Sequence, residues 1–445
     1  MRHFIAALLL FGSAAMAQEH FSGLGNTSHT GILRGSINPA EFSNLSSEYE
    51  VNLFGLSVKA ANNKASISDL SGDDDFGDIM FRGNDPVNFL VDAEILGPGF
   101  AMRYGKWGFG VTSRATAKMQ LVDVDVELGD AISNSSSNSD VPTTVLSNRG
   151  NQRLNGTVWG EVGFSASRIL YDTEDHQLSA GLTLKILFPG SYANFGAGKF
   201  QGTINHDAET LTNTQASLHI AYSGNLGEDF ADAGDYLSSV FGSPNGLGVD
   251  LGVNYRLKAA DSTGYRVNAG AAIRNIGSMT FKADNNSDTN YQLTIQGADA
   301  LNLNLFDDTT SLEEIEQILL ESGYLNRTQN MARDFKVKLP TTFVAYADVR
   351  VVPKFYVSLL TQQRLNDRAD NKQVPVENVT TLTPRFSLSW FEVFSPWSVN
   401  EISGLTGGLG LRMGVFYMGS GSAFTALSGD AKQADFYMGF RFGLK

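Results

Sequence analysis

The sequence predicts an all-β protein, a single transmembrane antiparallel β-barrel of about 14 strands. Three observations lead to this prediction. The N-terminus has the pattern of a secretion signal. Most of the remaining chain consists of short segments in which apolar residues alternate with small or polar ones. The last of these segments runs to the C-terminus, where it can close a sheet into a barrel.

The first 17 residues read as a signal peptide. Arg2 precedes the apolar run Phe4–Phe11, and Ala15–Ala17 supplies the small residues of a cleavage site. We therefore expect residues 1–17 to be removed before Gln18. The apolar run is too short to span a bilayer as a helix. The chain has no cysteine, which rules out a lipid-modified N-terminal cysteine, disulfides and thiol chemistry.

Composition narrows the class of protein further. The net charge is −14, so we expect no nucleic-acid partner for this exported chain. No stretch approaches the 18 consecutive apolar residues of a transmembrane helix. An exported β-rich chain without such a helix is either a periplasmic β protein or an outer-membrane barrel. In lipid, only a closed barrel satisfies the backbone of a sheet.

Alternation of apolar and polar residues marks the expected strands. The clearest pair is 247–258 and 265–274, where Leu251 faces lipid and Asn254 faces the lumen. We expect an arginine to be costly at Leu251 and tolerated at Asn254. The least regular segments are the first and the sixth. The expected strands are 48–59, 99–104, 107–120, 158–168, 177–188, 192–205, 214–223, 247–258, 265–274, 341–351, 355–364, 382–391, 405–418 and 435–445.

The connections between these strands sort by length. With both termini in the periplasm, the periplasmic connections are mostly short, as in the two-residue turn Gly105–Lys106, and the external ones mostly long. The expected periplasmic connections are 105–106, 171–176, 206–213, 259–264, 352–354 and 392–404. The expected external loops are 60–98, 121–156, 189–191, 224–246, 275–340, 366–381 and 419–434.

Two external loops contain apolar residues at helical spacing, within 226–241 and 312–320. The second is preceded by a capping box formed by Ser311 and Glu314. Such helices need an apolar partner. They pack either against each other or around a ligand, and the sequence leaves both open.

Sequence signatures of an enzyme are absent. The chain has no G-x-S-x-G, H-E-x-x-H or G-x-x-x-x-G-K motif, so we expect no catalytic residue, cofactor or metal. The acidic residues between Asp69 and Asp85 lack the order of a calcium-binding loop and read as a solvated loop.

The last strand, 435–445, carries a pattern of its own. Tyr437, Gly439, Phe442 and Leu444 resemble the C-terminal signal that the barrel-assembly machinery reads, although Lys445 stands where family members usually end on an aromatic residue. This resemblance implies the assembly machinery and outer-membrane lipid as partners.

A short motif links the chain to a known superfamily. Asn38, Pro39 and Ala40 form an NPA motif ahead of the first strand, within the Gly-, Ser- and Asn-rich segment 18–47. Together with VNAGAAIRNIG at 267–277, it resembles the FadL superfamily of outer-membrane barrels. The chain is most similar to an uncharacterised FadL-related family of the Bacteroidota.

This resemblance implies three parts: the signal peptide 1–17, a hatch 18–47 that folds into the lumen, and a barrel 48–445. It also implies the outer membrane as location and the uptake of hydrophobic small molecules as function. The alternatives are an accessory barrel resembling PorV that serves protein secretion or surface assembly, with secretion proteins as partners, and then a general porin.

Charged residues on the predicted lumen side have two interpretations. Charges inside a barrel must be paired or hydrated. They form either a structural network that grips the hatch or an anion-selecting passage. The residues are Arg114, Glu161, Asp250, Arg256, Arg266, Arg274, Asp348, Arg350, Arg385, Arg412 and Arg441.

Overall fold

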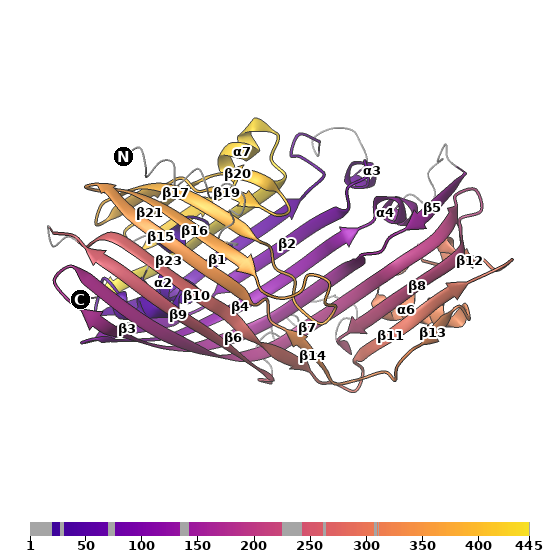
Figure 1. The fold of residues 1–445 in the computed structure, drawn as a ribbon, viewed down its shortest axis with the longest axis horizontal. Coiled ribbons are helices and arrows are strands. Elements are labelled where there is room, and N and C mark those ends of the chain that lie inside the picture. Colours follow the sequence, from indigo (N-terminus) through magenta and orange to yellow (C-terminus); the bar gives the residue numbers. More distant parts are fainter. Residues whose placement is uncertain are drawn as a thin grey trace.

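The computed structural model describes residues 20–26, 31–69, 76–133, 142–224, 243–260, 264–306, 309 and 311–444 (Figure 1). One antiparallel sheet closes on itself where the last strand pairs with the first along almost its whole length. Within the described residues, no helix is long and apolar enough to span a membrane. The expected signal peptide lies outside the described residues.

The ring contains about 14 antiparallel strands, which confirms the predicted fold class. In order they are β1 (Tyr49–Asn62), β2 (Val87–Leu96) continued by β3 (Gly99–Tyr104), β4 (Trp107–Val124), β6 (Asn151–Asp172), β7 (His176–Asn205), β9 (Gly246–Lys258), β10 (Tyr265–Phe281), β15 (Thr342–Val352), β16 (Phe355–Arg364), β17 (Val379–Ser387), β18 (Phe391–Phe394) continued by β19 (Trp397–Asn400), β20 (Gly404–Gly407) continued by β21 (Leu409–Met413), β22 (Phe416–Ser420) and β23 (Gln433–Leu444).

Two expected ring strands do not belong to the ring. The expected loop 189–191 is part of β7, which runs through it without a turn. The register against β6 slips there, and Gly190 takes up the extra residue as a bulge. Beyond the bulge, residues 193–205 pair with β8 (Thr210–Tyr222) instead of β9. The segments 192–205 and 214–223 therefore extend the sheet outward, and the connection 206–213 lies at its outer end.

Two further differences from the expected strands add two strands to the ring, so the total stays at about 14. The expected strand 382–391 ends at Ser387, and the chain turns back into β18 after three residues. The expected strand 405–418 contains a second turn, at which Gly414 has φ +57° and separates β21 from β22. Apolar and polar residues keep alternating across such short turns, so periodicity alone does not reveal them.

The sheet continues beyond the ring as an external layer (Figure 1). It is built from β5 (Thr143–Ser147), the outer half of β7, β8, β11 (Ser287–Ile295), β12 (Leu301–Asn302) and β13 (Leu325–Arg327). The helix α6 (Leu312–Glu321) covers its apolar face through Leu319. The capping box forms, since the Glu314 amide donates to Ser311 Oγ at 3.2 Å. The other expected helix, within 226–241, lies outside the described residues.

The remaining elements are short. Inside the barrel lie η1 (Leu24–Asn26), α2 (Gly31–Ile37) and η2 (Pro39–Asn44). The others are α3 (Phe76–Met80), α4 (Val126–Ser133), η5 (Leu303–Phe306), β14 (Phe335–Lys338) and α7 (Ala423–Ser428).

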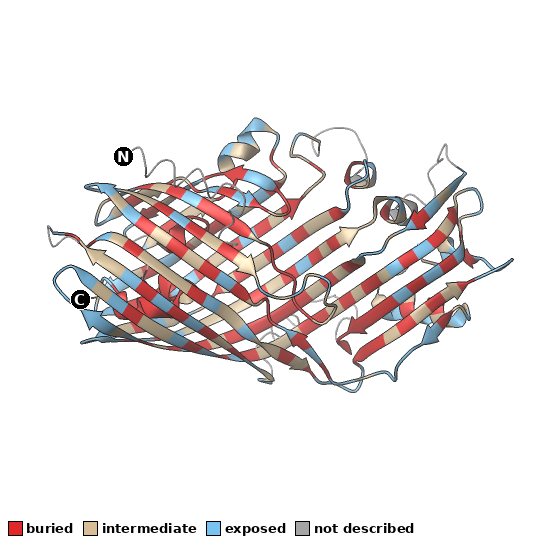
Figure 2. Ribbon diagram, in the orientation of Figure 1, coloured by how far each residue is buried: buried red, intermediate tan, exposed pale blue. Residues whose placement is uncertain are grey.

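Burial alternates along the barrel strands, as the red and blue bands of Figure 2 show. Apolar side chains such as Phe109, Leu251 and Phe440 point outward and are exposed, whereas Lys118 and Asn254 point inward and are buried. This is the reverse of a water-soluble barrel. It is the pattern expected of a barrel whose outer face meets lipid.

Candidate functional site

The N-terminal segment occupies the lumen. Residues 20–25 and 31–45 are almost all buried, and α2 lies within the ring of strands (Figure 1). We call the described part of this segment, 20–26 and 31–47, the hatch. Its apolar side chains Leu24, Ile32 and Phe42 pack against wall residues such as Tyr417 and Tyr437.

The NPA motif fixes the turn of the hatch between α2 and η2. Asn38 caps η2, because the Ala40 amide donates to Asn38 Oδ1 at 3.0 Å. Pro39 takes the first helical position, where its missing N–H costs no hydrogen bond. Asn38 Nδ2 also donates to the Val253 carbonyl at 2.8 Å and to Tyr346 Oη at 3.2 Å. One side chain therefore caps the hatch and ties it to two strands.

Inward-facing glycines let the motif approach the wall backbone. A Cβ on Gly252 would lie 2.0 Å from Asn38 Oδ1, and one on Gly181 would lie 2.4 Å from the Pro39 carbonyl carbon. Neither position leaves room for a side chain. The glycines of β7 and β9 thus form a seat shaped for the motif.

Glu41 is the charged centre of this contact. Its side chain is fully buried and accepts from Asn254 Nδ2 at 3.0 Å and Asn268 Nδ2 at 2.8 Å. Arg34 lies 3.3 Å from one oxygen and Arg256 lies 2.7 Å from the other. Burial alone would raise the pKa of Glu41, but the two guanidinium groups and the hydrogen bonds from Asn268 and Tyr346 lower it to about 2. Glu41 therefore anchors the hatch as an ionised group.

Most of the predicted lumen charges point inward and pair with carboxylates. Arg256 contacts the hatch itself, whereas the other pairs below join wall residues to one another. Several of the partners were missed, because Glu94 and Glu392 lie in segments expected to be connections and Glu50 lies in the least regular of the expected strands. The closest contacts are Arg114–Glu94 at 3.0 Å, Arg114–Glu161 at 3.5 Å, Lys185–Asp250 at 2.9 Å, Arg385–Asp348 at 2.8 Å, Arg412–Glu392 at 2.7 Å and Arg441–Glu50 at 2.7 Å.

Three of the arginines predicted to line the lumen differ from the others in position or surroundings. Arg266 is exposed, so the prediction that it faces the lumen is wrong. The register against β9 shifts at this point, and Tyr265 takes the inward position with its hydroxyl on Asp348. Arg350 lies near the end of β15 and is half-buried, and Arg274 reaches into an internal chamber without a close carboxylate among the described ion pairs.

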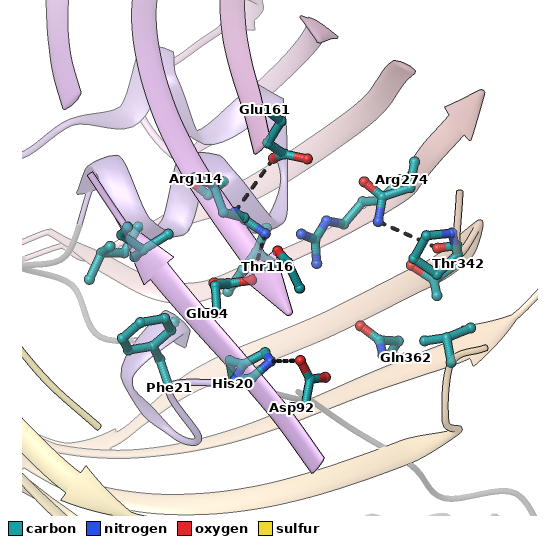
Figure 3. A pocket seen from close by; sticks show the side chains of 18 of the residues that line it. His20, Phe21, Asp92, Glu94, Arg114, Thr116, Glu161, Arg274, Thr342 and Gln362 are labelled. Atoms are coloured by element: carbon teal, nitrogen blue, oxygen red, sulfur yellow. Dashed lines mark hydrogen bonds and ion pairs between the residues drawn. The ribbon is translucent and has the colours of Figure 1, made fainter. Parts of the chain in front are cut away.

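This chamber lies between the hatch and the wall and has a volume of about 90 Å³ (Figure 3). The hatch contributes an apolar floor of Phe21, Leu24, Leu33 and Ile37. The wall contributes charged groups. In Figure 3, Asp92 of the wall meets His20 of the hatch, with a distance of 3.1 Å between Nε2 and Oδ1. The further polar lining is Glu94, Arg114, Thr116, Lys118, Glu161, Arg274, Thr342 and Gln362.

The loop between β16 and β17 also reaches the chamber. Residues 366–381 were expected to extend outward, but 373–377 are buried within the barrel. Val376 lines the chamber together with the hatch residues. We call residues 365–378 the lid loop.

The four residues that resemble the C-terminal signal are divided between the inner and the outer face of the last strand. Tyr437 Oη donates to the Ser22 carbonyl of the hatch at 2.8 Å, and a Cβ on Gly439 would meet Tyr417 Oη. Phe442 is half-buried and Leu444 is exposed at the end of the strand. Recognition by the assembly machinery stays a prediction.

The sequence matches, over residues 39–421, the family described as "Family of unknown function (DUF5723)". No curated protein matches it. Similar solved structures include the Ralstonia pickettii toluene transporter TbuX (11% identity, TM-score 0.41, covering 94% of this chain and 95% of that chain) and the P. putida toluene transporter TodX (10%, 0.44, 92% and 92%). A Pseudomonas aeruginosa FadL homologue shares 10% identity, with TM-score 0.33 and coverage of 96% and 98%.

Proposed function

The chain belongs to the DUF5723 family of unknown function, and we propose that it is an outer-membrane barrel that takes up hydrophobic small molecules past a displaceable hatch. The observation that carries this proposal is the hatch itself. It occupies the lumen, where polar contacts centred on Asn38 and Glu41 hold it in addition to its apolar packing. A barrel closed in this way passes nothing at rest and opens when the hatch moves.

The apolar floor of the chamber supports hydrophobic compounds as the cargo. A compound that enters contacts Phe21, Leu24 and Ile37, which belong to the hatch. Burial of its surface against these residues contributes about 25 cal/mol per Å² of apolar area, which can offset the cost of moving the hatch to make room. Because the present chamber holds about 90 Å³, entry and hatch movement are coupled. A permanently open porin fits this lumen poorly, since an open channel needs a continuous water-filled path.

A second candidate, an accessory barrel for secretion or surface assembly, is favoured by the external layer. That layer has a packed core of its own under α6, and uptake of a small molecule does not require it. As a secretion partner, the protein would co-purify with other envelope proteins from membranes solubilised in mild detergent. As an uptake barrel it would purify alone.

A disulfide that locks the hatch tests the proposal directly. A Cβ on Gly421 would lie 3.0 Å from Ser22 Cβ, which suits a cysteine pair after a small adjustment. The chain has no native cysteine to interfere. We expect Ser22→Cys/Gly421→Cys to lose uptake of a radiolabelled aromatic hydrocarbon by cells when oxidised, and to regain it on reduction. Ser22→Cys alone is the control. Uptake that continues through the oxidised pair would overturn the proposal.

A further inference from the structure

The lid loop enters the mouth of the barrel and docks like a short inner strand. Gln373 forms a parallel bridge with Lys338 of β14. The Val374 amide donates to the Lys338 carbonyl at 3.0 Å, and the Lys338 amide donates to the Lys372 carbonyl at 2.8 Å. The Val374 side chain is buried with Tyr192 and Phe335. The loop therefore has a defined seat.

The wall around the mouth provides donors aimed at the backbone of the loop. The Arg153 guanidinium donates to the Arg368 carbonyl at 2.7 Å and to the Asp370 carbonyl. The Tyr192 hydroxyl donates to the Asn371 carbonyl at 2.7 Å. These contacts hold the closed position of the loop through its backbone, from β6 and β7.

Ion pairs join the lid loop to several other parts of the protein. Lys372 meets Asp288 of the external layer at 2.5 Å, and Asp288 in turn lies 2.9 Å from His219 Nε2. Within the lumen, Glu377 meets Lys59 of β1 at 3.0 Å. Lys338 meets Asp370 at 2.7 Å. The loop therefore links the external layer to the lumen.

The outer and inner contacts differ in their exposure to water. The side chains of Lys338 and Lys372 are 60% and 41% exposed, whereas that of Glu41 is fully buried. Exposed ion pairs are weak and exchange readily with water, and breaking a buried pair is far more costly. The Lys338 and Lys372 ion pairs therefore break more easily than the contacts of Glu41, whereas the Glu377–Lys59 pair of the lid loop is itself buried.

We infer that the lid loop is a second, outer gate, in series with the hatch. This inference rests on the proposed function, since it assigns two gates to the same path. The chamber between them is bounded by Val376 above and by Phe21 and Ile37 below. Cargo enters when the lid loop lifts and leaves toward the periplasm when the hatch moves. The barrel thus encloses its cargo between two gates.

The test is a disulfide that holds the lid loop in its closed position, introduced into a barrel from which the hatch has been deleted. Deleting residues 18–44 removes the inner gate, and Lys338→Cys/Gln373→Cys then joins bridge partners whose spacing suits a disulfide. We measure single-channel conductance in planar bilayers. Without the cysteine pair, the hatch-deleted barrel should show repeated openings. With the pair it should lose them when oxidised and regain them with dithiothreitol.

The matched control is Thr280→Cys/Lys336→Cys, which joins the paired strands β10 and β14 beside the lid loop without touching it. Its oxidation should leave the openings unchanged. Openings that persist through the oxidised Lys338→Cys/Gln373→Cys lock would overturn the outer gate and leave the hatch proposal intact. If the hatch-deleted barrel stays silent, a variant that also lacks residues 366–377 should conduct. Silence in that variant contradicts the proposed function itself.

Discussion

A single carboxylate, that of Glu41, makes most of the polar contacts that fix the hatch to the barrel wall. It lies on η2, and its partners come from α2, β9, β10 and β15. Its burial would be unfavourable without Arg34 and Arg256, and theirs without it, so the three charges are mutually dependent. Sequence reasoning placed Arg256 on the lumen side, and its guanidinium lies 2.7 Å from Glu41. That reasoning did not show which acid this arginine meets, because that acid lies 215 residues earlier in the chain.

The first prediction concerns pH. Docking lowers the pKa of Glu41 from 4.5 to about 2. The stabilisation is therefore fully present above about pH 4.5 and is lost as the pH falls toward 2, in total on the order of 3 kcal/mol. Proteolysis of the hatch by pepsin should increase steeply across that range. In Glu41→Gln the hatch should already be sensitive at pH 4.5 and show a flatter pH profile. An unchanged profile in the variant would assign the pH dependence to another group.

The second prediction concerns the glycine seat. Gly252→Ala places a Cβ 2.0 Å from Asn38 Oδ1, so the NPA turn should shift at a cost of about 1–3 kcal/mol. Gly156→Ala in β6 is the control, because its Cβ meets nothing closer than 3.9 Å. Hatch accessibility to trypsin should rise in the first variant alone. Equal accessibility in both would show that the seat tolerates a methyl group.

At the scale of elements, position within a strand does not by itself predict tolerance to substitution. Leu251 faces outward and is 48% exposed, so Leu251→Arg should cost about 2–4 kcal/mol near the bilayer midplane. Asn254 faces inward and was expected to accept arginine. The structure contradicts this expectation, because Asn254 is buried and bonded to Asn44, Glu41 and Asn268.

The third prediction follows from this contrast. Both Leu251→Arg and Asn254→Arg should reduce folding yield into lipid vesicles, with Leu251→Met as a tolerated control. Deleting residues 18–44 should rescue Asn254→Arg, which then faces an emptied lumen, and should leave Leu251→Arg impaired. Failure of the deletion to separate the two variants would mean that the inward cost does not come from the hatch.

At the scale of the whole molecule, the closed ring determines the behaviour in detergent. Because β23 pairs with β1 from Tyr49 to Ala61, the barrel has no free edge from which to unfold. The fourth prediction is that the folded protein migrates faster on a gel when unheated than after boiling. The comparison is made on one preparation in the same detergent. Identical migration of the two samples, with mainly helical circular dichroism, would contradict the barrel.

The sequence determined the parts of the structure that depend on local pattern. Alternation over a few residues indicates which face each strand presents, and so the barrel, the lipid-facing residues and most inward arginines followed from it. The hatch did not follow from alternation; only the resemblance carried by Asn38, Pro39 and Ala40 implied it. Local pattern misled where a single bulge reversed the faces, as at Arg266.

Tertiary structure alone decided which segments meet. The partner of β7 changes from β9 to β8 at Gly190, and the lid loop turns inward toward β14. Each outcome depends on register and on contacts between distant segments. Alternation does not specify these, because a strand presents the same side chains to the same face whichever strand it pairs with. The gates and the chamber between them follow from those contacts, so they were decided only when the whole chain folded.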